Sequence, residues 1–452
     1  MKQLLVKYPN KFRAVLFNKQ AAHVSVCFSM RAGAEQEGKS INGASHIIER
    51  MIKSELVGMV NGFGGVVESS VSYELISWTI SSSREFLEDS IRAMASAVFD
   101  FFPKSTTLNT QKSKVLQEIE KQNFNPIAIL NEITQKQMYK GTALSQEVIG
   151  SAKSVSLMEL AAVKEFYTKM LSPQNICLSV IGKIGDKVKI EKPEGDKPNT
   201  NKVIDTTNFD PSWMVPSKEL QNYSPDYKIT DSLNEVTGYV NNYFYSRTIK
   251  LESKYKCRSV KFVSLNQPIC VSKPKSLNQT RFQISFPSAP YVSTGYKYSK
   301  LIETYLTYAL REEVLKLLNV YGVNVSVVDF KNNGRLSITF ATDAEVAEER
   351  YLAVINKLKQ IASEGVSEKE FNVLKNMYET TVSLYHESST EIAYRFNKWL
   401  LIKDELFNLN TEIAGIKAMT YENFSYTLNH ILDFNKMLVV VLGKKPDGFV
   451  PF

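Results

Sequence analysis

The sequence predicts an α+β protein made of two similar halves, and three observations support this fold class. Strand-length apolar runs alternate with long helical patterns along the chain. The same order of elements occurs twice. Each half also closes with a helix and then a hydrophobic strand that ends in Gly-Lys, at residues 176–183 and 437–444. The chain of 452 residues is long enough to bury two or more cores.

The first half contains strand-type runs separated by two long helical patterns. Residues 84–101 and 112–139 have helical periodicity, so we expect a long helix in each. Ser156 and Glu159 have the spacing of a capping box, which predicts that a further helix begins there and runs through Tyr167. The runs typical of strands are residues 13–17, 24–30, 74–81 and 176–181.

The second half repeats this order. Ser367 and Glu370 form another capping-box pattern, and a long helical run follows it. Residues 185–227 are rich in Lys, Asp, Asn and Pro and lack periodicity, which indicates a linker rather than a third core. The other expected elements are strands at 282–286, 323–330 and 336–341 and helices at 299–319 and 344–363. We therefore expect an N-terminal domain at 1–190, a linker or insertion at 191–255 and a C-terminal domain at 256–452.

The first half carries an altered zinc motif. It reads His-x-x-Glu-Arg, with His46, Glu49 and Arg50, whereas the inverted zinc motif is His-x-x-Glu-His. Histidines four residues apart lie one helical turn apart and face one ion, and the glutamate between them polarises the zinc-bound water. Arg50 has no lone pair to donate, and its charge repels a divalent cation. The motif therefore predicts a site that cannot hold catalytic zinc.

The surroundings of the motif have a recognisable order. It runs from Tyr8-Pro9-Asn10-Lys11 through 24–30, Ala32-Gly33-Ala34, the segment 43–51 and Phe63-Gly64-Gly65 to 69–74. This order resembles the pitrilysin and mitochondrial processing peptidase family, and the resemblance covers nearly the whole chain. It implies a duplicated metallopeptidase-like fold, in which each half is a mainly antiparallel sheet packed with helices.

The resemblance also assigns the remaining site positions. Val115-Leu116-Gln117-Glu118-Ile119 resembles the helix that gives the third zinc ligand, which falls on Glu118, and a further family glutamate falls on Gln111. Of the five site positions (46, 49, 50, 111 and 118), two therefore lack the residue that the family's chemistry needs, namely Arg50 and Gln111.

We interpret His46, Glu49, Arg50 and Glu118 as the remnant of a zinc site, with no catalytic residue, no metal ligand and no cofactor. A lone histidine on an apolar helix is more often structural than a ligand. Arg50 can reach into the ligand space and pair with Glu118 or, failing that, with Glu49. Breaking such a pair costs about 3–5 kcal/mol if it is fully buried.

Two further features of the family were sought in the second half. Active members place an Arg and a Tyr there to hold the substrate peptide, and Arg311 and Tyr321 stand near the matching place with a longer separation. A surface helix arginine is the better interpretation. The α-subunit of the processing peptidase has a glycine-rich loop in this half, but residues 300–321 contain no glycine. We expect that loop to be absent.

These departures make the chain most similar to the core proteins of mitochondrial respiratory complex III, and in particular to the second. The resemblance implies a non-catalytic scaffold on the matrix side of the inner membrane. Its partners would be a homologous subunit (a first core protein or a β-type processing peptidase), cytochrome b, cytochrome c1 and the Rieske protein. Two alternatives stay open: a non-catalytic α-type subunit of the processing peptidase that binds presequences, and an active zinc peptidase with a replaced ligand.

Composition excludes some other classes of function. The net charge is +8, but Lys and Arg look scattered, so no basic stripe predicts nucleic-acid binding. The longest apolar runs have strand length, which predicts membrane contact only through partners.

The first 34 residues carry six basic and no acidic side chains, as presequences do, although a strand expected at 13–17 is the better interpretation. The four cysteines have no metal-type spacing and fit buried thiols: Cys27, Cys177, Cys257 and Cys270.

Overall fold

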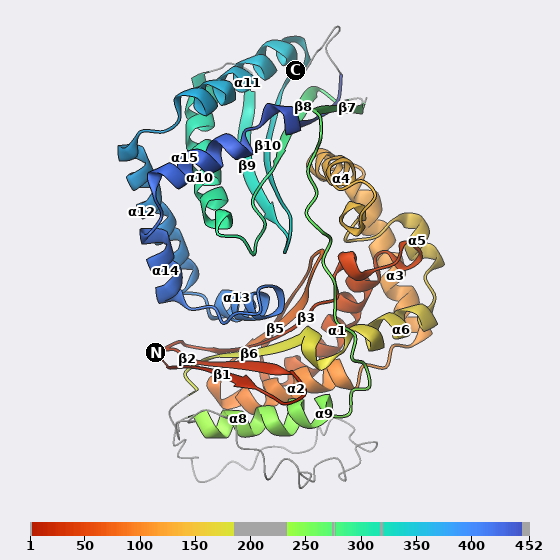
Figure 1. Ribbon diagram of the computed structural model, residues 1–452. Coiled ribbons are helices and arrows are strands. Elements are labelled where there is room, and N and C mark those ends of the chain that lie inside the picture. The colour runs from red at the N-terminus through yellow and green to blue at the C-terminus, as the bar shows by residue number, and fades with distance from the viewer. Residues whose placement is uncertain (1, 185–232, 274, 276, 317–319, 445–452) are drawn as a thin grey trace.

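The computed structural model describes residues 2–184, 233–273, 275, 277–316 and 320–444. Two sheets, one in each half of the chain, lie one above the other with helices around them (Figure 1). The expected α+β fold with two similar, mainly antiparallel halves is confirmed. Most of the linker expected at residues 191–255, namely residues 191–232, lies outside the described residues.

The N-terminal sheet has six strands in the order β1-β2-β6-β3-β5-β4. Its neighbours pair antiparallel except β2 and β6, which are parallel. The edge strand β4 alternates exposed and half-buried residues, whereas the central strands are buried on both faces. The strands are β1 (Lys2–Lys7), β2 (Arg13–Asn18), β3 (Val24–Met30), β4 (Val66–Val71), β5 (Ile76–Ser82) and β6 (Ile176–Gly182).

Helices of the first half cover one face of this sheet. α1 (Ala44–Val60) contacts β4 and β5, and α2 (Leu87–Phe99) contacts β3 and β5. The other helices before the linker are α3 (Ser105–Gln122), α4 (Pro126–Met138), α5 (Ala152–Leu157) and α6 (Leu160–Met170). After the linker, α8 (Asn234–Val240), a π-helical turn (Asn241–Tyr245) and α9 (Ser246–Thr248) add to the same core.

The helix expected at residues 112–139 is instead two helices, α3 and α4. The break has a local cause. Pro126 stands at the first turn of α4, where its missing N–H does no harm, but inside a longer helix it would remove a hydrogen bond. The side chain of Asn125 caps the new helix by accepting from the N–H groups of Ile127 and Ala128. The apolar residues keep helical spacing on both sides of Pro126, so the sequence pattern does not indicate the break.

The C-terminal sheet has five strands in the order β7-β11-β8-β10-β9, with β7 and β11 parallel. Its strands are β7 (Ile269–Lys273), β8 (Gln279–Pro287), β9 (Val320–Asp329), β10 (Gly334–Asp343) and β11 (Leu438–Leu442). The helices of this half are α10 (Gly295–Lys316), α11 (Ala347–Glu364), α12 (Glu368–Tyr385), α13 (Ser389–Ile402), α14 (Leu409–Lys417) and α15 (Tyr421–Ile431).

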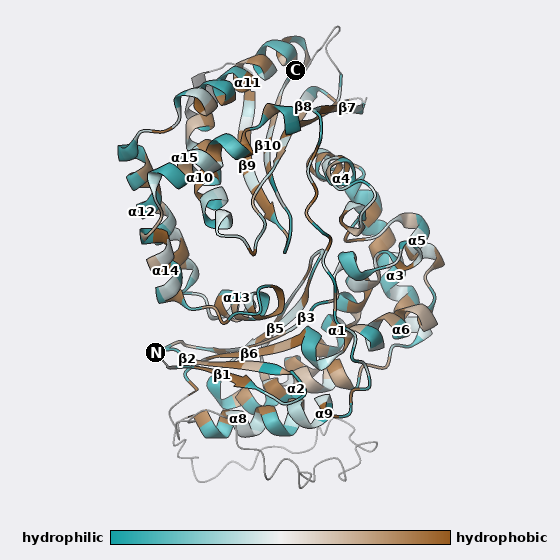
Figure 2. Ribbon diagram, viewed as in Figure 1, coloured by the Kyte–Doolittle hydropathy of each residue, from teal (hydrophilic) through white to brown (hydrophobic). Residues whose placement is uncertain are grey.

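The two halves exchange helices across their interface. α13, from the second half, packs on β3 and β6 of the first sheet, on the face opposite α2 and α8 (Figure 1). In return α4, from the first half, packs on β8 and β11 of the second sheet. The alternation along β11 agrees, since Val439 and Val441 face the second half's own core and Val440 faces the cluster that contains Leu130 of α4. Figure 2 shows that the helices are amphipathic, with mixed apolar and polar faces.

A buried asparagine fixes α13 on the first sheet. The side-chain amide of Asn397 donates to the carbonyl oxygen of Cys27 and to Ser29 Oγ, both at 3.0 Å, and its Oδ1 accepts from Ser179 Oγ at 2.6 Å. All four residues are buried. Such a satisfied network sets the register of the helix on strands β3 and β6.

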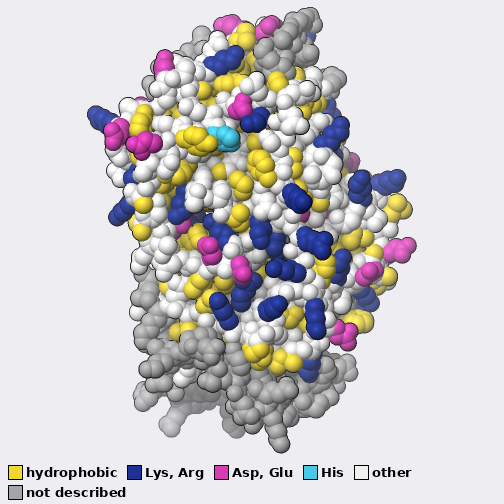
Figure 3. Space-filling model, in the orientation of Figure 1, with side chains coloured by type: hydrophobic (Ala, Val, Ile, Leu, Met, Phe, Trp, Pro, Cys, Tyr) yellow, Lys and Arg dark blue, Asp and Glu magenta, His cyan; other side chains and the backbone are white. Residues whose placement is uncertain are grey.

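An extended strap, residues 249–263, connects the halves on one face (Figure 1). Exposure alternates over residues 251–258 of the strap, so every second residue there faces water. Cys257 of the strap points inward and is buried, and its thiol donates to the carbonyl oxygen of Arg31 at 2.7 Å. The prediction that basic residues are scattered is wrong here, because the alternation turns Lys254, Lys256 and Arg258 outward together. Figure 3 shows Lys and Arg side chains gathered on this face.

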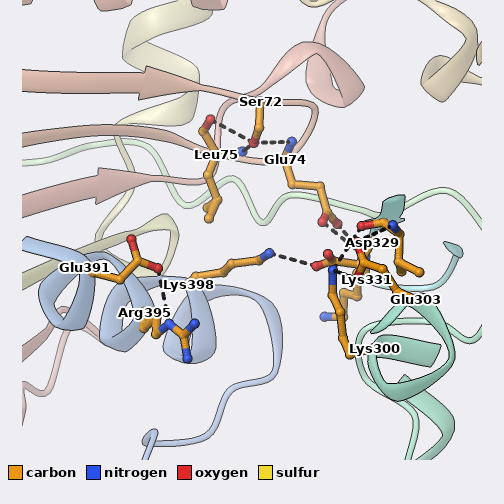
Figure 4. A network of polar contacts seen from close by, with 11 residues as sticks. Ser72, Glu74, Leu75, Lys300, Glu303, Asp329, Lys331, Glu391, Arg395 and Lys398 are labelled. Atoms are coloured by element: carbon orange, nitrogen blue, oxygen red, sulfur yellow. Dashed lines mark hydrogen bonds and ion pairs between the residues drawn. The ribbon is translucent and has the colours of Figure 1, made fainter. Parts of the chain in front are cut away.

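Two buried glutamates of the first half hold backbone N–H groups of the second. Glu35 Oε1 accepts from the N–H of Val260 at 2.5 Å, and the carboxylate of Glu74 accepts from the N–H of Lys331 at 3.0 and 3.1 Å (Figure 4). Nearby, Lys398 of α13 forms an ion pair with Asp329 at the end of β9, with 2.8 Å between Nζ and Oδ2. The seam between the halves therefore contains buried polar contacts beside the apolar clusters under α13 and α4.

Burial raises the pKa values of the two glutamates at this seam, Glu35 and Glu74. Burial, and after it the neighbouring charge of Glu74, raise the pKa of Glu35 to about 7 against the opposing hydrogen bond from Val260. Burial also raises the pKa of Glu74, and the N–H of Lys331 opposes that shift. Near neutral pH the seam is therefore close to gaining or losing a proton.

Replacing Glu35 by Gln should flatten the pH dependence of the free energy of unfolding. The pKa of Glu35 is raised from 4.5 to about 7, so its stabilising contribution is complete below pH 4.5 and is lost as the pH rises to 7. The shift corresponds to about 3 kcal/mol. Chemical denaturation from pH 4.5 to 8 should show a steeper loss in the wild type than in Glu35→Gln. The exposed Glu348, changed to Gln, serves as the control. If the free energy of unfolding changes equally with pH in the wild type and in both variants, Glu35 does not carry this pH dependence.

Candidate functional site

The position of helix α1 sets the candidate site. Gly43 at its N-cap has φ of +96°, a conformation that suits glycine. The buried carboxylate of Glu37 accepts from the N–H groups of Gly43 at 2.7 Å and Ser45 at 2.6 Å and from the amide of Asn42 at 2.9 Å. A carboxylate here satisfies the free N–H groups of the first turn and interacts well with the helix dipole.

Helices α1 and α3 bring the altered motif together with Glu118. His46 Nε2 lies 3.1 Å from Glu118 Oε2. Arg50 Nη1 forms an ion pair with the other oxygen, Oε1, of the same carboxylate. Arg50 Nε also donates to Gln111 Oε1 at 3.2 Å. Glu118 is therefore held between the imidazole and the guanidinium, and the amide of Gln111 completes the arrangement.

Glu49 lies on the same helix but faces strand β4. Its Oε1 accepts from Ser69 Oγ, and its Oε2 lies 3.6 Å from His46 Nδ1. Its backbone carbonyl accepts from Trp78 Nε1 at 3.0 Å. The side chain is only 8% exposed, so these contacts hold the carboxylate in place.

These residues do not fit zinc. A catalytic zinc site uses three protein ligands, and within the described ranges no three His, Cys, Asp or Glu side chains form a group that could hold a metal ion. The position where the motif needs a second imidazole holds a guanidinium, which already neutralises the carboxylate that would be the third ligand.

Arg50 pairs with the carboxylate that the sequence indicates. The predicted bridge from Arg50 to Glu118 is confirmed, and the alternative bridge to Glu49 is not formed. The bridge is not fully buried, however, because the side chains of Arg50 and Glu118 are 26% and 35% exposed. The energy expected for a fully buried pair is therefore too high for this one. Arg311 is exposed, as the surface interpretation predicted.

A cavity of about 640 Å³ adjoins the site. His46 and Glu118 lie on one wall, residues of α4 such as Gln135 lie on another, and Val328 and Arg335 of the second half close it. Neither Gln135 nor Arg335 is predicted from the sequence as a site residue. No local signal marks them, since they become neighbours only through the packing of α4 on the second sheet.

The cysteines contribute no further site. Cys27, Cys177 and Cys257 are buried and Cys270 is half-buried, and none of the four forms a disulfide. Burial raises the pKa of Cys177 and of Cys257 to about 12, so both stay protonated. The interpretation as reduced, buried thiols agrees with three of the four positions.

Comparison with known families agrees with the architecture. Residues 13–152 match the model of the insulinase family, peptidase family M16, and residues 158–378 match that of the peptidase M16 inactive domain. The chain belongs to peptidase family M16. The family resemblance inferred from the motif order is therefore confirmed.

Individual relatives of this M16 chain are distant. It is 21% identical to "Cytochrome b-c1 complex subunit 1, mitochondrial" of Caenorhabditis elegans over 181 residues, which is 38% of each chain. It is 23% identical to an uncharacterised zinc protease of Bacillus subtilis over 186 residues, 39% of this chain and 46% of that one. The chain thus spans less than half the length of these relatives.

Solved structures share the whole M16 fold. A protease from Helicobacter pylori has a TM-score of 0.78 at 14% identity, with 98% of this chain and 99% of that one covered. A chain of complex III2 from Candida albicans has a TM-score of 0.73 at 12% identity, with 97% and 95% covered. Both similarities concern the fold.

Changing Arg50 to Ala should destabilise the chain moderately. The change leaves the carboxylate of Glu118 with His46 but without its guanidinium, and the pair is about one-third exposed. We expect the free energy of unfolding to fall by about 1–2 kcal/mol. Denaturant titration of the wild type and the variant measures this. Gln111→Ala, which keeps the ion pair, should cost less; an unchanged midpoint in Arg50→Ala would show that the bridge contributes nothing.

Changing Arg50 to His should restore zinc binding. The substitution places two imidazoles one turn apart on α1 and frees Glu118 to act as the third ligand. Inductively coupled plasma mass spectrometry after zinc loading and desalting should find about one zinc per chain. Arg50→Gln removes the same charge without adding an imidazole and should stay empty. Equal zinc contents in the two variants would mean that position 50 does not control the site.

Proposed function

We propose that this chain is a non-catalytic scaffold subunit of mitochondrial respiratory complex III, on the matrix side of the inner membrane. The observation that carries the proposal is the ion pair between Arg50 and Glu118, which occupies the place of a metal ion in an intact M16 fold. A chain that keeps this fold without its catalytic donors must act through its contacts. In this role it supports electron transfer from ubiquinol to cytochrome c without a cofactor of its own.

The comparisons favour complex III over other scaffolds. One curated relative is a cytochrome b-c1 complex subunit, and a chain of a complex III2 assembly shares the fold along almost its full length. The inactive-domain model of the family matches residues 158–378, the longer of the two matched segments. We infer a homologous core subunit as the direct partner, with contacts to cytochrome b, cytochrome c1 and the Rieske protein.

Attachment to the membrane would then come from the partners. Among the described residues, no helix combines the length and apolar character needed to cross a bilayer. A peripheral subunit needs a large permanent interface, of roughly 2,000 Å² or more. The outer strands of each sheet and the exposed side chains Phe102, Phe124 and Leu157 offer surface for such contacts.

The second candidate is a non-catalytic α-type subunit of the mitochondrial processing peptidase. It would share the degenerate site and would also pair with a homologue. Residues 295–316 form the continuous helix α10, which leaves no place in that stretch for the glycine-rich loop of that subunit. This observation makes the complex III role the better proposal. An active peptidase is disfavoured by Arg50.

Native purification of the tagged chain should separate these functions. If it is a complex III core subunit, mild-detergent extracts should yield it in stoichiometric amounts with cytochrome b, cytochrome c1 and the Rieske protein, since permanent complexes survive dilution. Mass spectrometry of the native band identifies the partners. Recovery in a detergent-free pair with a zinc-binding homologue would support the processing peptidase subunit instead, and a stable monomer would contradict both roles.

A further inference from the structure

The outer side of the strap, residues 249–263, carries a row of positive charges (Figure 3). Because exposure alternates over residues 251–258, the side chains of Lys254, Lys256 and Arg258 are exposed on one side of an extended segment. Two residues of extended chain span about 6.5–7 Å, which sets the spacing along this row. The strap contains five basic residues and one acidic residue, Glu252, which is exposed at one end of the row.

Two lysines from other elements lie beside the row. Lys169, near the end of α6, is exposed, and its Nζ lies 4.4 Å from the centroid of the Tyr255 ring. Lys331 follows β9 and is half-buried. Burial lowers the pKa of Lys331, and the charges of Arg31 and Lys256 act in the same direction. The fold thus holds several like charges close together on this face.

These charges have no counter-charge on the face itself. The nearby carboxylates of Glu35 and Glu74 are buried beneath the surface and accept from the backbone N–H groups of Val260 and Lys331. In the described part of the chain, no carboxylate forms an ion pair with any of the five side chains of this basic row: Lys169, Lys254, Lys256, Arg258 and Lys331. The basic row therefore stays positive toward solvent.

The first half of the chain fixes the strap in its extended conformation. Gln174 Nε2 donates to the carbonyl oxygen of Lys254 at 2.6 Å, and Gln36 Nε2 donates to that of Arg258 at 2.6 Å. The backbone is thus held at both ends of the three outward charges. A binding surface whose backbone is already ordered loses little conformational entropy when a ligand binds.

The surroundings of the basic row fit neither a membrane nor a nucleic acid. Membrane-surface segments combine basic side chains with apolar ones that insert into the lipid. The exposed apolar side chains of the strap, Ile249 and Phe262, stand at its two ends and not among the charges. Single-stranded nucleic acids need exposed aromatic faces for stacking, whereas Tyr255 is half-buried and its ring is covered by Lys169.

We propose that the basic row binds an extended acidic segment of a partner protein, with a carboxylate at every second residue. Such a segment has the same spacing of about 6.5–7 Å as the row, so several carboxylates meet several cations at once. A single exposed ion pair contributes little, and recognition therefore requires the whole row. Complementary charge also speeds association and selects the partner. This inference does not depend on the role in complex III.

Fluorescence anisotropy of the full chain with labelled peptides tests the proposal. The probe is acetyl-Glu-Thr-Glu-Thr-Glu-Thr-amide, and its isomer acetyl-Glu-Glu-Glu-Thr-Thr-Thr-amide has the same charge in a different order. At 50 mM NaCl we expect the alternating peptide to bind about fivefold more tightly than the isomer, and the difference to shrink at about 300 mM NaCl because salt screens exposed charges. Binding of the two peptides with equal affinity, or of neither at millimolar concentration, would overturn the proposal.

A charge-reversed strap locates the binding surface. The triple variant Lys254→Glu, Lys256→Glu and Arg258→Glu should abolish binding of the alternating peptide. The control reverses three exposed lysines of α3, α5 and α12 and should retain most of the affinity: Lys114→Glu, Lys153→Glu and Lys369→Glu. An equal loss in both variants would mean that only net charge attracts the peptide, and would contradict the proposal.

Two further measurements complete the test. The charge-reversed strap should melt at the wild-type temperature or higher, because the change removes like-charge repulsion. If it melts lower, Lys256→Gln replaces it and should weaken binding of the alternating peptide about threefold. Vesicles of phosphatidylcholine with 20% phosphatidylglycerol should not sediment the chain. Sedimentation that the charge-reversed strap abolishes, without discrimination between the peptides, would assign the row to a membrane surface and overturn the proposal.

Discussion

The reciprocal exchange of α4 and α13 is the constraint on which the rest of the structure depends. Each sheet has one face covered by helices of its own half and another covered by a helix of the other half. Neither sheet can bury both faces alone, so the halves are joined as one body. The exchange also places α4 beside β10, which creates the cavity and brings Gln135 to Arg335.

The same arrangement of the two halves positions the altered motif on helix α1. α1 still begins at Gly43, is still capped by Glu37, and still presents His46 and Glu49 as a zinc helix would. The guanidinium of Arg50 neutralises Glu118 and so removes the cost of a partly buried, unpaired carboxylate. This ion pair ties α1 to α3.

Features set by local residue type and spacing are predictable from this sequence, whereas contacts between distant segments are not. The fold class, the closing strands, the capping box at Ser367 and the bridge from Arg50 to Glu118 follow from residue type and spacing. The break before Pro126 was concealed because the helical periodicity continues across it. The exchange of α13 and the pairing of Gln135 with Arg335 join residues far apart in the chain, and no local pattern encodes such contacts.

The central claim is that the site cannot hold zinc because Arg50 and Glu118 pair in its place. Native mass spectrometry of the wild-type chain, purified without chelators and then incubated with equimolar zinc, tests this most directly. The account predicts the mass of the metal-free chain, with only weak adducts that disappear on buffer exchange. One tightly held zinc per chain, retained through buffer exchange and lost when His46 is replaced by Ala, would contradict it.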